Sequence, residues 1–235
     1  MLTKTIKTIA VLFLALILAW SCKKDEDDTP ETKYQAPSLA SHYNVIQVPE
    51  KLSSSTDQNA QMAAGYMSMA NALSGYASFF EVPENATQSK LKSSATVYTW
   101  TYDGTTVKLT YNEDATKRYW TWYVNNVKFM DCQELITGNG GSFNVYDVEN
   151  GGTAVIVYNW EQSATAITSA MKLIGSETYL FETTATLDGK SGKFDMYEGG
   201  TTAGLHILNV TWLSNGSGSW WISYGGETYS GNWTA

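Results

Sequence analysis

The last three fifths of the chain alternate in hydrophobicity with a period of two residues. From about residue 94 onward, short runs of β-branched and aromatic residues are separated by turn signals about every 8–12 residues. Asp103-Gly104 and Asp188-Gly189 are typical of tight hairpins, and no segment between the runs has the length of a crossover helix. We therefore expect antiparallel strands in sequence order. About twelve are predicted: Thr96–Tyr102, Val107–Tyr111, Tyr119–Val124, Val127–Ile136, Ser142–Val148, Thr153–Glu161, Ala164–Ile174, Thr178–Leu187, Lys193–Tyr197, Gly204–Leu213, Ser219–Tyr224 and Thr228–Trp233.

Both faces of these strands are rather apolar. In Tyr119–Val124, for example, tyrosines and a threonine share one face, and Trp120, Trp122 and Val124 share the other. A single-layer sheet with one face in water would alternate more cleanly, so we expect the sheet to curl on itself. The predicted fold is mainly β: an antiparallel up-and-down barrel or half-barrel of about twelve strands with one N-terminal amphipathic helix. In pattern alone, this resembles the lipocalin-like and clam-shaped lipid-carrier lipoproteins, and no site residue is carried over from them.

Residues 56–80 are the one segment with a convincing helical period. Ser55 and Gln58 have the spacing of a capping box, and Pro83 ends the helix. Small residues elsewhere on the segment allow a neighbour to approach closely. The face expected to pack against the sheet carries Met62, Tyr66, Met69, Leu73, Tyr76 and Phe80.

The N-terminus has the pattern of an export signal. Lys4 and Lys7 precede the apolar run Ile9–Trp20, which is too short for a transmembrane helix of about 20 residues. The run ends in Ala19-Trp20-Ser21-Cys22, which resembles a bacterial lipobox. The resemblance implies that residues 1–21 are a signal peptide and that Cys22 is lipidated and anchors the protein to the membrane. Cleavage by the ordinary signal peptidase and an uncleaved N-terminal anchor are the alternatives.

The residues after Cys22 bear on the location of the protein. The run Lys23–Asp28 is basic and then acidic, and it resembles the start of Bacteroidota lipoproteins exported to the outer face of the outer membrane. A lipid-anchored, surface-exposed protein is therefore expected, with a periplasm-facing anchor as the second choice. Residues 22–53 are polar and contain three prolines, which predicts a flexible tether. Residues 54–235 are predicted to form a single β-rich domain.

Charge and composition exclude several functions. There are 15 Lys+Arg against 23 Asp+Glu, and the net charge of -8 argues against nucleic acid as a partner. Two cysteines and two histidines leave little material for a metal site, and none is predicted. The chain has no nucleotide-binding or dinucleotide-binding motif, so no cofactor is expected.

A weak internal repeat joins two parts of the strand-rich region. Gly141–Asp147 (GSFNVYD) is similar to Gly192–Glu198 (GKFDMYE), and Trp160 and Trp212 follow them at similar distances. Duplication of a hairpin pair and the ordinary recurrence of glycine turns in an antiparallel sheet both explain it.

Aromatic side chains are the strongest indication of a binding site, because they are 13% of the chain. Such ladders line a cavity for a small apolar ligand or stack on sugar rings. Cross-strand packing is the alternative, at roughly 0.2–1 kcal/mol per pair. The predicted ligand-binding residues are Tyr98, Trp100 and Tyr102 in one strand, Trp120 and Trp122 in another, and His206.

No catalytic constellation is recognisable. A pairing of Cys132 with His206 is conceivable in space, but their spacing does not support it. A pair of inward carboxylates would suit acid–base catalysis on a glycosidic bond, but the sequence does not show which strand carboxylates converge. The carboxylates within or at the ends of the predicted strands are Asp131, Glu134, Asp147, Glu161, Glu182, Asp195 and Glu198. We favour an outer-membrane lipoprotein that binds a glycan or a small apolar ligand. The alternatives are a surface hydrolase or lyase that acts on a glycan through a carboxylate pair or His206, and an accessory subunit of a surface protein complex.

Overall fold

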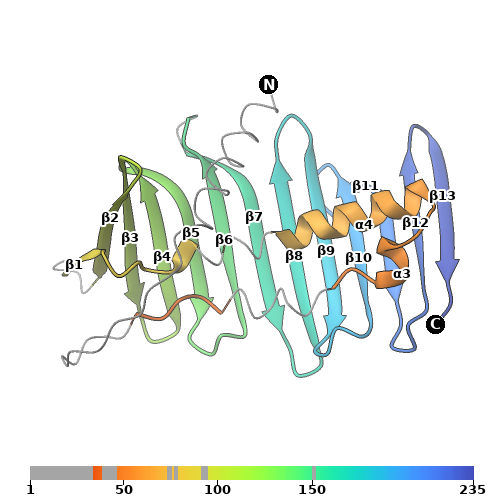
Figure 1. Cartoon of the computed structure of the whole chain (residues 1–235), viewed down its shortest axis with the longest axis horizontal. Helices are drawn as coiled ribbons and strands as arrows, with labels where there is room; N and C mark the ends of the chain where they lie inside the picture. The colour runs from red at the N-terminus through yellow and green to blue at the C-terminus, as the bar shows by residue number, and fades with distance from the viewer. Residues whose placement is uncertain (1–33, 39–46, 73–75, 77–78, 91–94, 150–151) are drawn as a thin grey trace. The chain divides into compact units, whose positions relative to one another are not determined.

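One antiparallel sheet of thirteen strands, in strict sequence order, forms most of the fold (Figure 1). The computed structural model describes residues 34–38, 47–72, 76, 79–90, 95–149 and 152–235, of which those from Gln35 onward belong to one compact unit. Residues 1–33, with the predicted signal peptide and Cys22, lie outside the described residues. The strands are β1 (Thr87–Lys90), β2 (Thr96–Tyr102), β3 (Thr105–Glu113), β4 (Lys117–Val124), β5 (Val127–Leu135), β6 (Gly140–Asp147), β7 (Thr153–Gln162), β8 (Ala166–Ile174), β9 (Thr178–Thr186), β10 (Gly192–Glu198), β11 (Leu205–Trp212), β12 (Gly218–Tyr224) and β13 (Glu227–Trp233).

The mainly β, antiparallel, up-and-down fold is confirmed, whereas closure into a barrel is not. Strands β1 and β13 end the row at opposite edges, so the sheet is open. The expectation that the sheet curls into a barrel or half-barrel rested on the apolar character of both faces. Instead, one face is covered by helical segments from the N-terminal part of the chain, so its side chains are buried without the sheet curling on itself.

The tight turns follow the local sequence. Asp103 and Gly104 between β2 and β3 have φ values of 45° and 73°, and Asn125 and Asn126 between β4 and β5 have 49° and 67°. Two consecutive positive φ angles match the right-handed twist of the flanking strands, and Asn, Asp and Gly tolerate them best. These turns set sequential antiparallel pairing.

The two faces of the sheet differ in chemistry. The helix face, named for the helical segments that cover it, carries the buried core, which includes Trp120, Phe143, Phe181, Phe194 and Leu208. The polar face carries the alternate residues, which include Asp131, Asn144, Asn159, Glu182 and Asp195. The side-chain period of two therefore separates core from surface across the whole sheet.

The predicted helix is shorter than expected. Helix α4 (Gln58–Asn71) begins at the N-cap Asp57, whose carboxylate accepts hydrogen bonds from the amides of Asn59 and Ala60. A short helix, α3 (Glu50–Ser53), precedes it and buries Leu52. Helix α4 contacts β11, β12 and β13. In Figure 1 it lies in front of the C-terminal half of the sheet.

The face of α4 that packs is also not the predicted one. Met69 is 41% exposed, whereas Ala60, Ala63, Ala64 and Met67 are buried. Small alanines let neighbouring backbone approach closely, and that close contact replaces the wide stripe of large residues that we expected. Among the expected residues farther along, Tyr76 and Phe80 are buried beyond the end of α4, and Leu73 lies outside the described residues.

The internal repeat corresponds to hairpins. Gly141 pairs with Trp160 in β6–β7, and Gly192 pairs with Trp212 in β10–β11. Hairpin β12–β13 repeats the arrangement with a glycine and a tryptophan in the same positions, which sequence comparison missed because its turn is shorter. In each hairpin the indole occupies space above a glycine on the preceding strand. This recurring pair favours the duplication interpretation.

Part of the predicted tether contacts the sheet. The carbonyl of Gln35 accepts a hydrogen bond from Nε1 of Trp120 at 3.1 Å, and the amide of Ser38 donates to Oε1 of Glu134 at 2.8 Å. Residues 35–38 are thus held at the helix face. No helix in the described ranges is both long and apolar enough to cross a membrane.

Candidate functional site

Most of the predicted ligand-binding aromatics lie in the core. Trp120 is fully buried against Phe80, and Trp122 meets Phe79 edge-on, with 5.3 Å between ring centroids. Tyr98 is also buried. Other side chains of the protein cover these rings. Their burial favours the alternative that they pack within the fold over the prediction that they bind a ligand.

Trp100 and Tyr102 lie on the same helix face but are half-buried. The ring of Trp100 lies edge-on to that of Trp122, with 6.3 Å between centroids. The sixth predicted residue, His206, lies on the polar face in β11. The structure therefore separates His206 from the five predicted aromatics.

His206 belongs to a cluster organised by Asp195. Nε2 of His206 lies 2.9 Å from Oδ1 of Asp195, and Nδ2 of Asn209 donates to the same oxygen at 2.9 Å. Nζ of Lys193 lies 2.7 Å from Oδ2. Asp195 is only 5% exposed, so the three donors, and not water, provide most of the stabilisation of its carboxylate.

Two aromatic rings enclose the imidazole. Tyr197 stacks on His206 with 4.5 Å between centroids and an interplanar angle of 20°. Trp221 of β12 approaches the imidazole edge-on at 4.6 Å. All three rings are half-buried, so they form a partly exposed aromatic surface beside a buried carboxylate. We call Lys193, Asp195, Tyr197, His206, Asn209 and Trp221 the Asp195 cluster.

A β-bulge brings His206 opposite Tyr197. The register of β10 and β11 shifts between Met196 and Tyr197, so that Met196 pairs with Leu208 and Tyr197 pairs with His206. Without the shift, the imidazole would not face the tyrosine. Bulges commonly re-aim side chains in this way.

The surroundings of Lys193 and Tyr197 shift the pKa values of both groups upward. The hydrogen bond to Asp195 raises the pKa of Lys193, and burial together with the charges of Asp195 and Glu182 raises the pKa of Tyr197. Lys193 therefore stays charged and Tyr197 stays protonated near neutral pH. Glu182 lies directly opposite Asp195 on β9.

Three polar atoms in the cluster have hydrogen-bonding capacity to spare. Within the described part of the chain, no residue bonds to the hydroxyl of Tyr197, Nδ1 of His206 or Nε1 of Trp221. These rings thus combine an apolar surface with an unused polar atom. Trp221 was recognisable in the sequence only as one of two adjacent tryptophans on opposite faces.

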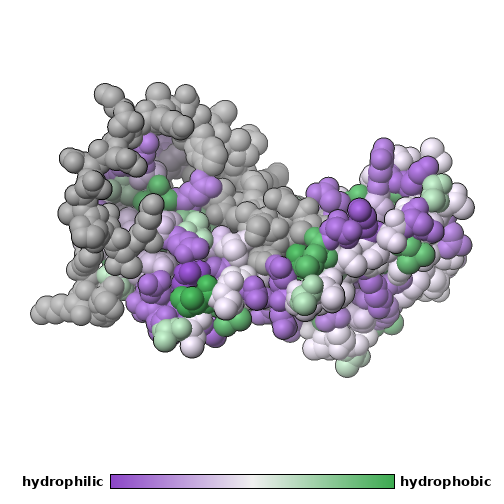
Figure 2. Space-filling view, turned by 90° about the horizontal axis from the view of Figure 1, so that it is seen from below, coloured by the Kyte–Doolittle hydropathy of each residue, from purple (hydrophilic) through white to green (hydrophobic). Residues whose placement is uncertain are grey.

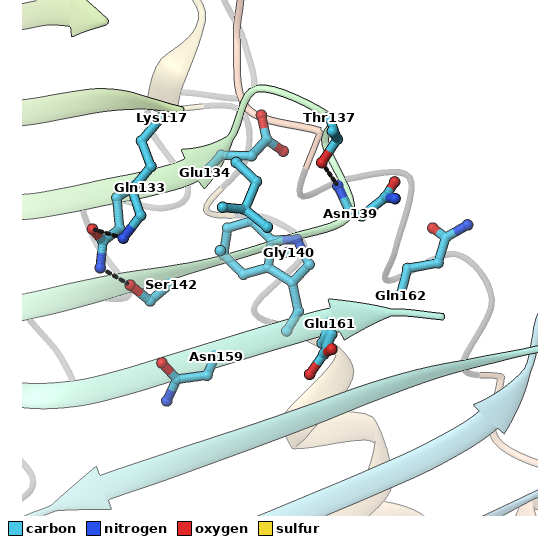
Figure 3. Close-up of a pocket in the computed structure, with 13 residues that line it drawn as sticks. Lys117, Gln133, Glu134, Thr137, Asn139, Gly140, Ser142, Asn159, Glu161 and Gln162 are labelled. Carbon is cyan, nitrogen blue, oxygen red and sulfur yellow. Dashed lines mark hydrogen bonds between the residues drawn. The ribbon is translucent and has the colours of Figure 1, made fainter. Parts of the chain in front are cut away.

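A second group of polar residues on the polar face lines part of a hollow of about 530 Å³ at the ends of β5, β6 and β7 (Figure 3). Nζ of Lys117 donates to Oε1 of Gln133 at 3.3 Å, and Nε2 of Gln133 donates to the hydroxyl of Ser142 at 3.0 Å. Asn159 follows on β7 and is exposed. We call Lys117, Gln133, Ser142 and Asn159 the Gln133 group.

Cys132 does not join His206. It is buried on the helix face of β5, whereas His206 is on the polar face, so the conceivable pairing of the two is wrong. Burial raises the pKa of the Cys132 thiol well above its ordinary value, which disfavours the nucleophilic thiolate. Among the described residues, no group of three or more His, Cys, Asp or Glu side chains is arranged to hold a metal ion.

The hydrophobic side chains visible in Figure 2 are separated by hydrophilic ones on the part of that side not covered by grey atoms. Isolated exposed residues such as Leu205 and Leu213 are normal on protein surfaces. The view therefore adds no support for a large apolar partner-binding patch.

No protein-family model matches this chain, and no curated protein matches it significantly in sequence.

Proposed function

We propose that this chain is a lipid-anchored protein that binds a glycan on the polar face of its sheet. The observation that carries the proposal is the Asp195 cluster, where the half-buried rings of Tyr197, His206 and Trp221 adjoin a buried carboxylate. Sugar rings have apolar C–H faces that stack on aromatic rings, and hydroxyl edges that bond to planar polar groups. The cluster offers both within one surface.

A glycan suits this surface better than a small apolar ligand. The most apolar aromatics, Trp120 and Trp122, are already buried by Phe79 and Phe80. Most residues that line the hollow carry amides, hydroxyls or charges, and Leu135 and Trp160 are its two large apolar residues, whereas pockets for apolar ligands are lined mainly by hydrophobic residues. The net charge of -8 favours a neutral glycan over an acidic one.

The membrane attachment in this proposal comes from the sequence. The lipobox-like residues before Cys22 and the charged run after it support an anchor in the outer membrane, with the domain at the cell surface. Facing the periplasm is the alternative. Metabolic labelling with a palmitate analogue tests the anchor, and Cys22→Ser is expected to abolish the label.

Hydrolysis of a glycan is the second candidate, because Asp195 and Glu182 are cross-strand neighbours beside His206. Directly opposed residues on neighbouring strands lie about 4.5–5.5 Å apart at their Cα atoms. Carboxyl groups about 5 Å apart are used by retaining glycosidases. Asp195 is, however, already bonded to three donors, which favours a structural carboxylate and therefore binding over cleavage.

The test of binding uses the full-length protein on an array of neutral gluco-, manno- and xylo-oligosaccharides, followed by calorimetry on those captured. Trp221→Ala is expected to weaken binding at least about fivefold, because stacking on an aromatic contributes about 1–3 kcal/mol. Tyr224→Ala is the matched control, because Tyr224 is an exposed aromatic on the same strand whose hydroxyl contacts Asn59 of α4 on the other face.

Each outcome separates the candidates. Equal binding by both variants, or no capture of any sugar, overturns the proposed site. Shortened oligosaccharides after incubation identify a hydrolase, and Glu182→Gln would then remove that activity while Trp221→Ala would weaken substrate binding.

A further inference from the structure

A continuous row of side chains runs across the polar face, perpendicular to the strands. Each member is the direct cross-strand partner of the next, from β5 to β12. All but one carry a polar group. In order they are Gln133, Ser142, Asn159, Ala170, Glu182, Asp195, Asn209 and Trp221.

The row joins the two polar sites described above. The Gln133 group occupies its first three positions, and the Asp195 cluster occupies its last three. Ser142 and Asp195 are four strand intervals apart, which corresponds to about 19 Å at about 4.8 Å per interval. A monosaccharide cannot touch both sites, whereas an extended chain can.

The side chain in the middle of the row is short. Ala170 on β8 has the smallest side chain of the eight, and it lies between Asn159 and Glu182. A ligand crossing here meets a methyl group rather than a taller side chain. The shape thus leaves a path between the two sites.

From this row, and resting on the proposed function, we infer that the ligand is a linear, neutral glycan that lies across the strands. The length of a hexose unit is close to the interval between strands, so about one sugar unit falls on each strand and about five units reach from the Gln133 group to the Asp195 cluster. The Asp195 cluster supplies stacking, and the Gln133 group supplies amide and hydroxyl contacts at the far end.

Two connected sites predict a dependence on chain length. Once the chain is long enough to reach the second site, binding there becomes intramolecular, and the gain in affinity from such linkage is large. Affinity should therefore rise steeply near five units and then level off. A single site would give little gain after the first two or three units.

The experiment measures the affinity of the full-length protein for one oligosaccharide series captured on the array, from the disaccharide to the octasaccharide. We expect the octasaccharide to bind at least about tenfold tighter than the disaccharide. Asn159→Ala should weaken octasaccharide binding severalfold and leave disaccharide binding unchanged, whereas Trp221→Ala should weaken both. Asn232→Ala is the control, because Asn232 is an exposed asparagine on β13 outside the row.

The outcomes distinguish this inference from the function on which it rests. Binding that depends on Trp221 but has the same affinity for the disaccharide and the octasaccharide overturns the extended site and keeps the proposed function. A rise with length that Asn159→Ala does not reduce also overturns it, because the longer chain then runs elsewhere. If the unmodified protein binds no sugar of any length, the proposed function itself is overturned. Circular dichroism melting of each variant shows that the exposed substitutions leave the fold intact.

Discussion

The indole of Trp212 lies over Gly192 on the neighbouring strand, in the space that a side chain would otherwise take. A Cβ at Gly192 would stand 2.5 Å from the carbonyl oxygen of Thr184 and 2.7 Å from Cη2 of Trp212. Nε1 of Trp212 donates to the carbonyl of Gly189 at 3.0 Å, which holds the ring in place. The equivalent Trp233 covers Gly218 and bonds to Gly216 in the same way.

Gly192→Ala is therefore expected to destabilise the protein. The added methyl group meets a backbone oxygen and a ring that is hydrogen-bonded in position, and such overpacking costs about 1–3 kcal/mol. Chemical denaturation of the unmodified protein and of the variant measures the difference in the free energy of unfolding. A variant as stable as the unmodified protein would show that the indole moves aside freely.

Gly65→Ala should have the opposite effect. Gly65 lies in the interior of α4, it is exposed, and no atom lies within 4 Å of where its Cβ would stand. Alanine loses less backbone entropy in a helix, so a gain of about 0.5–1 kcal/mol is expected. Denaturation measured beside Gly192→Ala gives an internal comparison of two glycine substitutions with opposite signs. Destabilisation by Gly65→Ala would mean that another surface occupies this face of α4.

The ion pair between half-buried Arg118 and buried Glu134 predicts a large effect of removing one partner. Nη1 of Arg118 lies 3.7 Å from Oε2 of Glu134, whose side chain is 1% exposed. Arg118→Leu leaves the carboxylate buried without its cation, which costs about 3–5 kcal/mol. Adding Glu134→Leu removes the unpaired charge and should recover part of that loss.

The two variants are compared by denaturation midpoints at neutral pH. A double variant no more stable than Arg118→Leu alone would show that Glu134 acts mainly through its bonds to Ser38. A cost below about 1 kcal/mol for Arg118→Leu would place the pair with ordinary surface ion pairs.

Tyr111 makes stability depend on pH in the alkaline range. Burial and the hydrogen bond to Glu113, with an O···O distance of 2.8 Å, raise the pKa of Tyr111 to about 12. Because the folded pKa is the higher one, the stabilisation is fully present below the unfolded pKa near 10 and is lost as pH rises through about 12. Tyr111→Phe should flatten this loss, since phenylalanine does not titrate.

Unfolding of the unmodified protein and of Tyr111→Phe, measured between about pH 9 and pH 12, tests this. Other tyrosines titrate in the same range in both proteins, so only the difference between the two curves reports Tyr111. Parallel curves would contradict the prediction.

Much of the strand order was predictable because it is local. All twelve predicted strands are present, and no end is shifted by more than two residues. The largest combined difference is in β3, which extends two residues beyond each predicted end. Asp103-Gly104 and the alternating aromatics carried that information within a few residues. Strand β1 was missed because its four residues, TQSK, have no apolar alternation.

The candidate site was less predictable because it depends on contacts between strands. The sequence indicates His206 only as a single residue, whereas its partners Asp195, Tyr197 and Trp221 come from β10 and β12. The contact between Tyr197 and His206 requires the register shift after Met196, and no local sequence pattern predicts that shift. The prediction of the five aromatics rests on alternation alone, and alternation does not reveal which face the helical segments cover.

The amino-acid sequence by itself determined the antiparallel, up-and-down order of the sheet, because turn chemistry and a period of two act over neighbouring residues. Only the tertiary structure decided that the sheet stays open, that α4 packs through its alanines, and that Asp195 gathers His206 and Asn209. Those outcomes depend on which distant surfaces meet, and the free energy of burying one face against another is a property of the whole fold.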